Sequence, residues 1–166
     1  MIETEQLILR PWKEDDAESL YKYASDSRVS ELALWPCHTS AEMSRDVIRY
    51  IFAPNPYSFA IVLKTTGEPI GSIGLVPKED EHHYTAEEER EVGYWIGYPY
   101  WGKGLTTEAL YGLIEFCRDS LCLKSLMITT DTRNTASQRV AEKCGFELLE
   151  NYMYDGTSGK AYRLCL

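Results

Sequence analysis

A chain of 166 residues is long enough for one domain with a hydrophobic core of its own, and we expect that domain to span residues 1–166. The formal net charge of −9 disfavours non-specific binding to nucleic acid, which needs a surplus of Lys and Arg. No stretch is long and apolar enough to cross a bilayer, so we expect no membrane partner.

The N-terminus and the cysteines indicate a cellular compartment. The first ten residues lack the basic and then apolar order of a signal peptide, so we expect a cytoplasmic protein. The five cysteines are odd in number and irregularly spaced, and no C-x2-C pair occurs among them. We therefore expect reduced thiols and no bound metal. The cysteines are Cys37, Cys117, Cys122, Cys144 and Cys165.

The first third of the chain predicts one strand and two helices. Residues 5–12 are apolar and end at a proline, which is typical of a short strand. Residues 14–26 open with acids and continue with an apolar stripe, which predicts a helix. Residues 30–39 are ambiguous, and their proline favours a loop. Either Thr39 or Ser40 then caps a second helix, which runs through about residue 52.

The middle of the chain predicts a hairpin and a third strand around a charged tract. The apolar runs 58–64 and 69–76 are joined by a glycine-containing turn, which predicts a β-hairpin. Residues 78–91 are strongly charged, and we expect them to be exposed. Residues 91–98 are rich in β-branched and aromatic residues and should form a strand.

The last third alternates helices and strands. Apolar residues from Thr106 to residue 121 fall on one helical face. Residues 124–131 read as a buried strand, and residues 134–146 as a short helix with a glycine stop. Two terminal strands flank an Asp-Gly turn at 155–159. This mixed order predicts an α/β or α+β protein whose sheet is partly antiparallel.

One turn stands out, because Gly102-Lys103-Gly104 separates the strand at 91–98 from a helix start. The first turn of a helix offers free N–H groups and a partial positive charge. Glycines let the backbone approach an anion closely, while Lys103 adds a cation and Thr106 and Thr107 add hydroxyl donors. We therefore expect a phosphate or diphosphate site. The alternative is a tight loop whose glycines serve only the chain reversal.

Spacing excludes two familiar phosphate loops. The pattern G-x4-G-K-[ST] is absent, and Thr107 stands where the dinucleotide fingerprint G-x-G-x-x-G would place its third glycine. A nucleotide-phosphate enzyme is therefore the weakest candidate class.

A second motif makes the assignment specific. Thirty residues after the glycine turn, beyond another strand, the chain reads Asn134-Thr-Ala-Ser137 and then Lys-Cys-Gly-Phe at 143–146. Together the two motifs resemble the acyl-CoA-binding core of the GNAT N-acetyltransferases. The N-terminal stretch TEQLILRPWKEDDAESLY and the stretch EVGYWIGYPYWGKGLTTEAL resemble the RimJ/RimL branch, which acetylates ribosomal proteins. The resemblance covers about residues 3–150.

The resemblance implies a fold and a cosubstrate, acetyl-CoA. The fold is a mixed, mostly antiparallel twisted sheet of about six to seven strands with about four helices. The family's phosphate turn usually has Gln or Arg at its first position and Gly or Ala at its last, where this chain has Trp101 and Thr106. Neither departure removes the backbone donors. The implied cofactor-binding residues are Trp95, Ile96, Gly97, Trp101, Gly102, Lys103, Gly104, Leu105, Thr106, Thr107, Asn134, Ser137 and Lys143.

The resemblance also implies the contacts of the pantetheine arm. It would pair with the strand end at Trp95, Ile96 and Gly97, as an added strand does. A backbone N–H near Ile96 would stabilise the oxyanion of the thioester. The same strand end could instead be ordinarily paired.

The amine acceptor must lose a proton before it can attack. Glu91 matches the position of the family's strand glutamate, so it is our candidate base. The alternative is a solvated acid at a strand end, because Glu87, Glu88 and Glu89 lie beside it.

The departing CoA thiolate needs a proton or a hydrogen bond. Ser137 lies one helical turn after Asn134, so both project from one face. The resemblance implies that this pair lies near the CoA arm, which makes Ser137 the candidate donor to sulfur. Tyr152 is a rival acid. The alternative is that Asn134 only caps the helix and Ser137 is merely exposed.

Other side chains rank lower as catalytic groups. We expect His82 and His83 to be exposed in the charged tract, and Cys144 to pack at a helix end. Trp35 is the best candidate for the acceptor pocket. Residues 28–40 and 78–90 are the segments expected to select the acceptor.

The sequence thus predicts an acetyl-CoA-dependent N-acetyltransferase. It would act by direct attack of a primary amine on the thioester, with a protein N-terminus or a small molecule as acceptor. The acidic balance slightly favours a cationic acceptor. The competing class is a catalytically silent acyl-CoA-binding or regulatory module of the same fold. The oligomeric state stays open, with a homodimer as one option.

Overall fold

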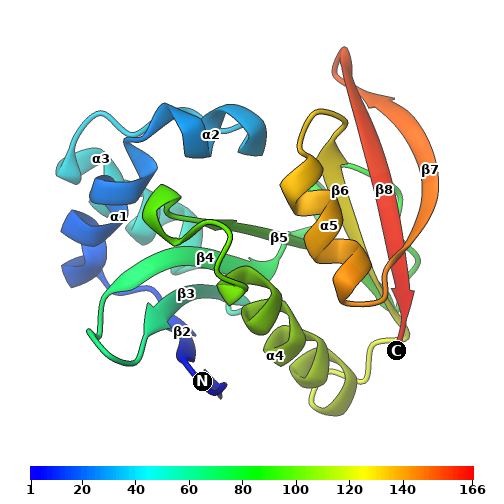
Figure 1. The fold of residues 1–166 in the computed structure, drawn as a ribbon, viewed down its shortest axis with the longest axis horizontal. Helices are drawn as coiled ribbons and strands as arrows, with labels where there is room; N and C mark the ends of the chain where they lie inside the picture. Colours follow the sequence, from blue (N-terminus) through cyan, green and yellow to red (C-terminus); the bar gives the residue numbers. More distant parts are fainter.

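The computed structural model describes all 166 residues, which build one eight-stranded sheet (Figure 1). The strand order is β1-β2-β3-β4-β5-β6-β8-β7, and the pair β5–β6 is parallel while all other neighbours are antiparallel. The strands are β1 (Ile2–Glu3), β2 (Leu7–Pro11), β3 (Ser58–Leu63), β4 (Pro69–Leu75), β5 (Glu89–Ile96), β6 (Ser125–Asp131), β7 (Glu147–Tyr154) and β8 (Thr157–Cys165).

Five α-helices accompany the sheet, and several begin with the capping side chains that favour a helix start. Asp26, Ser40 and Asn134 each accept a hydrogen bond from a backbone N–H in the first turn of α2, α3 and α5. None of the helices is long and apolar enough to cross a membrane. The helices are α1 (Ala17–Ala24), α2 (Ser27–Ala33), α3 (Ala41–Val47), α4 (Leu105–Asp119) and α5 (Thr135–Lys143). Three short 3-10 helices, η1 (Glu14–Asp16), η3 (Lys78–Asp80) and η4 (Tyr98–Tyr100), lie between these elements, and a short π-helix, η2 (Ile48–Phe52), continues α3.

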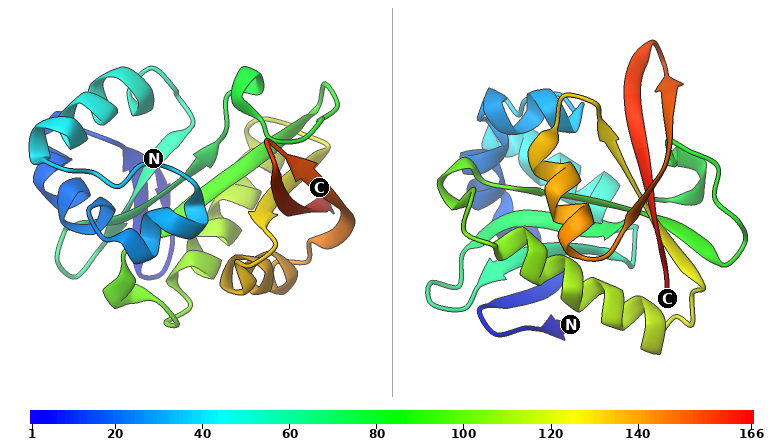
Figure 2. Two further views of the ribbon diagram at one scale, coloured as in Figure 1. Left: turned by 90° about the horizontal axis from the view of Figure 1, so that it is seen from above. Right: turned by 45° about the vertical axis from the view of Figure 1, so that its right-hand side comes forward.

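The helices cover two different faces of the sheet (Figure 2). A large core packs α4 and α5 against one face, and a smaller core packs α1 and the end of α3 against the other. In the left view of Figure 2, the tract 76–88 lies on the side opposite α4 and α5. Successive side chains of a strand point to opposite faces of the sheet, and those of Val92, Tyr94 and Ile96 on β5 contact the large core. Glu91 therefore belongs to the other face of the strand.

The parallel strands β5 and β6 are paired along only part of their length. Their last paired residues are Val92 and Ile128, although β5 continues to Ile96 and β6 to Asp131. Beyond Val92, β5 stays paired with β4, and beyond Ile128, β6 stays paired with β8. The two strands therefore separate in the middle of the sheet. We call the unpaired segments 93–96 and 129–131 the β5/β6 fork.

The expected fold class is confirmed, with differences in detail. The eighth strand is the two-residue β1, and the fifth helix is α2, which occupies part of the segment that we expected to be a loop. The helix is short because Leu34 turns into the left-handed region with φ 62°. The tract 78–91 is less exposed than expected, since Thr85, Glu89 and Glu91 are buried.

Candidate active site

The Gly102–Gly104 turn presents free donors at the start of α4. Gly102 and Gly104 have φ angles of 73° and 77°, in the left-handed region that favours glycine. Gly104 is the N-cap of α4, and nothing lies within 4 Å of the position that a Cβ would occupy there. None of the backbone N–H groups of residues 102–107 donates a hydrogen bond within the protein. This arrangement of N–H groups at a helix N-terminus suits an anion.

The Lys103 side chain adds a positive charge at this turn. Lys103 forms no ion pair, and its Nζ lies 5.7 Å from the centre of the Tyr100 ring. Lys143, at the end of α5, accepts a hydrogen bond from the Tyr111 hydroxyl of α4 at its carbonyl. The next residue, Cys144, contacts the Thr107 carbonyl. The fold therefore brings the end of α5 beside the first turns of α4.

The fork leaves main-chain groups of β5 available. Gly97 donates its N–H to the Ile70 carbonyl of β4, and backbone directions alternate along an antiparallel pair. The backbone N–H and C=O groups of Trp95 therefore point toward β4, as the N–H of Gly97 does. Those of Tyr94 and Ile96 point into the fork. The Ile96 carbonyl accepts a hydrogen bond from the Trp101 indole at 2.9 Å. The Ile96 N–H remains at the fork, at the strand end where the family resemblance led us to expect the oxyanion donor.

Asn134 and Ser137 lie at the fork on the α4/α5 face. The Asn134 side chain accepts the Ser137 N–H at 3.2 Å, so the residue caps α5. The Ser137 hydroxyl donates to the Tyr94 hydroxyl at 3.0 Å, and Tyr94 donates to the Ser137 carbonyl at the same distance. Burial raises the pKa of Tyr94, so its hydroxyl stays protonated. The hydroxyls of Ser137 and Tyr94 form one unit across the fork.

Glu91 lies on the opposite face and is buried rather than solvated. Its Oε1 accepts hydrogen bonds from the Thr129 hydroxyl at 2.6 Å and from His82 Nδ1 at 2.8 Å. Its Oε2 accepts the backbone N–H of His82 at 2.6 Å. The hydrogen bond to Glu91 raises the pKa of the His82 imidazole, although burial acts against this. A carboxylate and an imidazole thus form a bonded pair at the fork.

Tyr152 approaches from the same face as Glu91. Its ring lies over Gly159 of β8 and makes an edge contact with His83, 5.1 Å between ring centres. His83 in turn forms an ion pair with Glu150 of β7. Burial raises the pKa of Tyr152. Ser137 and Tyr152, the two expected donors to sulfur, therefore reach the fork from opposite faces.

On the face of the sheet that carries Glu91, aromatic side chains extend toward α2. Trp35 and Trp95 pack with ring centres 5.4 Å apart, and His38 lies 5.6 Å from Trp35. Trp35 therefore lies where it would line an acceptor pocket on this face.

Sequence reasoning missed Tyr94 and Thr129 and ranked His82 low. Tyr94 could have been found from alternation, because it shares a face with Ile96 two residues away. Thr129 gave no local signal, since its partner Glu91 is remote in sequence. His82 is indeed exposed, but it is anchored to Glu91.

Known proteins match the whole architecture. Residues 6–147 match the family model described as an acetyltransferase (GNAT) domain. The "Uncharacterized N-acetyltransferase p20" of Bacillus licheniformis is 31% identical over 156 residues, which cover 90% of this chain and 85% of that protein. The spermidine N(1)-acetyltransferase of Escherichia coli K12 is 27% identical over 165 residues, 95% of this chain and 84% of the other.

A solved structure gives the same result. A putative ribosomal-protein-serine acetyltransferase from Vibrio cholerae superposes with a TM-score of 0.80 at 27% identity, covering 99% of this chain and 97% of that chain. The fold and site therefore define an acetyl-CoA-dependent acyltransferase acting on amino groups. The chain belongs to the GNAT acetyltransferase family and is an N-acetyltransferase.

Proposed function

We propose that residues 1–166 form a single GNAT domain of the RimJ/RimL-like branch, which acetylates a primary amine by direct attack on the thioester. The acceptor that we favour is the α-amine of a peptide or protein N-terminus. The observation that carries this proposal is the β5/β6 fork, which opens between the free N–H groups of residues 102–107 and the Glu91–His82 pair.

The fork suits an extended arm of acetyl-CoA. The diphosphate would bind the N–H groups at the start of α4, with Lys103 and Lys143 nearby. The pantetheine amides would pair with the free backbone groups of Tyr94, as an added strand does. The Ile96 N–H would then stabilise the oxyanion.

The two hydroxyl donors have different support. Ser137 shares its hydrogen bond with Tyr94 on the α4/α5 face, next to the cap residue Asn134. We assign thiolate stabilisation to the Ser137–Tyr94 unit, because it lies on the face from which the arm would enter. Tyr152 lies on the other face beside His83, where an acceptor would lie.

The favoured acceptor follows from proton chemistry. An α-amine has a pKa of about 8, whereas an alkyl amine has a pKa of about 10.4. A base near neutrality can deprotonate the first at little cost, but the second costs roughly 3 kcal/mol more. The name of the Vibrio cholerae relative supports a protein acceptor, and that of the Escherichia coli relative supports a polyamine.

The test is turnover with a panel of amines. Purified protein is incubated with acetyl-CoA and either peptides with free N-termini or spermidine, and thiol release and acetylated product are measured together. We expect product with peptides, and none when the same peptides carry blocked N-termini. Spermidine as the better substrate would contradict the favoured acceptor. CoA binding without turnover of any amine would favour the silent module.

A further inference from the structure

Glu91 is poorly placed to meet an amine itself. The residue is only 2% exposed, and both of its carboxylate oxygens accept hydrogen bonds. The three donors are the Thr129 hydroxyl and the ring and backbone N–H of His82. Three of the roughly four acceptor sites of the carboxylate are therefore occupied, and the burial of Glu91 keeps an amine away from the fourth. The accessible member of the cluster is His82, whose side chain is 42% exposed.

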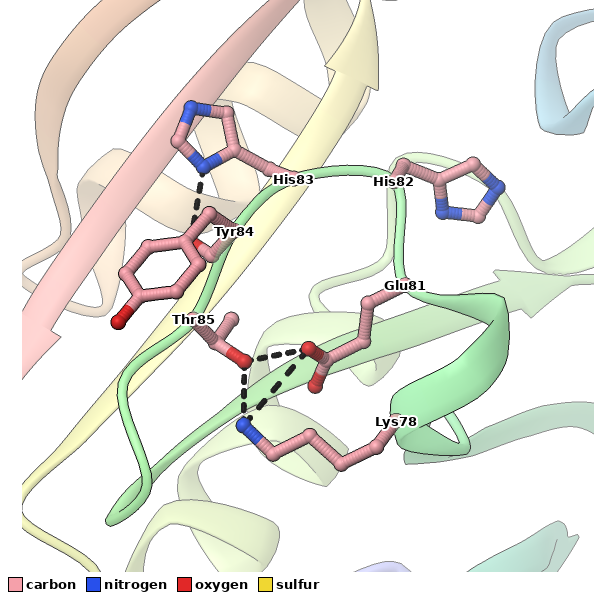
Figure 3. A pocket seen from close by; sticks show the side chains of 6 residues that line it. All are labelled: Lys78, Glu81, His82, His83, Tyr84 and Thr85. Carbon is pink, nitrogen blue, oxygen red and sulfur yellow. Dashed lines mark hydrogen bonds and ion pairs between the residues drawn. The ribbon is translucent and has the colours of Figure 1, made fainter.

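The bond to Glu91 fixes how the His82 ring presents itself. An ionised carboxylate only accepts hydrogen bonds, so Nδ1 carries the proton in the neutral imidazole. Nε2 then bears the free lone pair, and it makes no hydrogen bond in the protein. In Figure 3 the rings of His82 and His83 project in opposite directions from the tract. The Nδ1 atom of His82 is therefore bound to Glu91, and the Nε2 atom is available to accept a proton.

The tract that carries His82 is tied down on both sides of it. Lys78 Nζ donates to the Thr85 hydroxyl (Figure 3) and, at 2.8 Å, to the Glu89 carbonyl. The Thr85 hydroxyl donates to Glu81, and Glu81 Oε1 accepts the backbone N–H of Glu91 at 3.0 Å. A cavity of about 390 Å³ borders this tract. These bonds hold the imidazole in place without a regular helix or strand.

The His82 ring lies at the closed end of the fork. Glu91 pairs with Met127, one residue before the last paired residues of β5 and β6. Thr129, the other donor to Glu91 Oε1, is the first β6 residue beyond that pairing. His82 shares this oxygen with Thr129, so its ring lies where the two strands begin to separate. An acyl group reaching through the fork from the α4/α5 face would arrive beside it.

We propose that His82 is the general base of the acetyl transfer and that Glu91 is its positioning residue; this assignment rests on the proposed function above. The ammonium form of the acceptor first loses a proton to solvent, and the neutral amine nitrogen then forms a bond to the acetyl carbonyl carbon and gives up one proton to His82 Nε2. The C–S bond breaks, and the sulfur leaves with the electron pair as CoA thiolate. The products are the acetamide, the thiolate and an imidazolium that Glu91 neutralises.

Charges around His82 set the pH range of this step. Groups facing it are Glu91 on β5, Asp80 in η3 and the edge-packed Tyr154 on β7, with His83 and Tyr152 adjacent. The hydrogen bond to Glu91, opposed by burial, raises the pKa of His82 above its ordinary value of 6.5. The base must be neutral, so turnover is expected to rise as pH increases through that raised pKa.

The first experiment compares two neighbouring histidines. With a saturating peptide substrate at pH 7.5, we expect His82→Ala to lower kcat by about 100-fold or more, the usual scale of general-base catalysis. His83→Ala is the matched control for chemical rescue, because imidazole should not raise its kcat whatever activity it retains. Added imidazole should restore part of the lost kcat in His82→Ala only. Full activity of His82→Ala, or a loss that imidazole does not relieve, would overturn the proposal.

The second experiment tests the His82–Glu91 pair by the pH dependence of kcat. Glu91→Gln removes the charge that raises the His82 pKa, so the acid limb of kcat should move to lower pH while the maximum falls. If Glu91 were the direct base, the substitution would remove the limb, and His82→Ala would matter little. Wild-type protein that turns over no amine would contradict the proposed function itself. An active wild type with a fully active His82→Ala variant would contradict only the role of His82.

Discussion

Gly104→Val is expected to raise the Kd for CoA by about 100-fold or more, since charge-assisted hydrogen bonds contribute roughly 1.5–3 kcal/mol each and at least two should be lost. Gly104 has a φ of 77°, and a branched side chain does not tolerate that region. The variant must rotate the backbone and misdirect the N–H groups that open α4, or place its methyl groups against the phosphates. Isothermal titration calorimetry with CoA measures the effect.

Gly67→Val is the matched control for this substitution. Gly67 lies in the turn between β3 and β4 with a φ of 72°, and like Gly104 it has nothing within 4 Å of a Cβ position. Both variants should therefore lose a similar amount of stability, about 1–3 kcal/mol. Only Gly104→Val should lose affinity. Equal Kd values for the two variants would show that residues 102–107 do not hold the diphosphate.

Arg163→Met is expected to lower the free energy of unfolding by about 3 kcal/mol, because it leaves a buried carboxylate without its cation. Arg163 reaches from β8 across β6 to Glu89 on β5, with an Nε–Oε2 distance of 2.6 Å. Glu89 is 1% exposed and also accepts the Ser125 hydroxyl at 2.7 Å. This ion pair stabilises the paired segment of β5 and β6, beyond which the fork opens. Urea denaturation at pH 7 measures the loss.

A second substitution distinguishes the stability lost through the unpaired Glu89 charge from the stability lost through packing. Glu89→Gln in the Arg163→Met background removes the charge and keeps an acceptor for Ser125, so most of the loss should be recovered. No recovery would mean that the arginine stabilises through packing alone.

The same ion pair gives a pH dependence of defined sign. Burial opposes ionisation of Glu89, but hydrogen bonds from Arg163 and Ser125 outweigh it and hold its pKa below the ordinary value. The wild-type pair thus stabilises the protein above the unfolded pKa of about 4.3, and the contribution is lost as pH falls through the folded pKa. Without Arg163, burial raises the pKa of Glu89, so the difference between wild type and Arg163→Met should shrink as pH falls through the raised pKa of the variant, and level off below the lowered pKa of the wild type.

Much of the fold is readable from local patterns. The strands carry β-branched and aromatic runs, and the hairpin turn at Gly67 and the turn at Asp155 and Gly156 show the positive φ angles that their residues favour. α2 was missed because its cap, Asp26, lay inside the end of the preceding predicted helix, and the helix has only seven residues. Such a short helix gives too little periodicity to detect.

The two halves of the site differ in how far the sequence defines them. The glycine turn is local, so the sequence indicated Gly102 and Gly104 as a candidate anion site, and the second motif made that prediction specific. The His82–Glu91 pair depends on contacts between a loop, β5 and β6, and a run of charges ordinarily indicates a solvated face. Burial of Glu91 follows from where the tract folds back, which no pattern within residues 78–91 could specify.

The most direct test of the account is a crystal structure of the protein with acetyl-CoA bound. We predict that diphosphate oxygens lie within hydrogen-bonding distance of the N–H groups of residues 102–107, with the pantetheine arm between β5 and β6 and the acetyl group beside His82 and Ile96. A diphosphate bound elsewhere, or an arm that bypasses the fork, would contradict it.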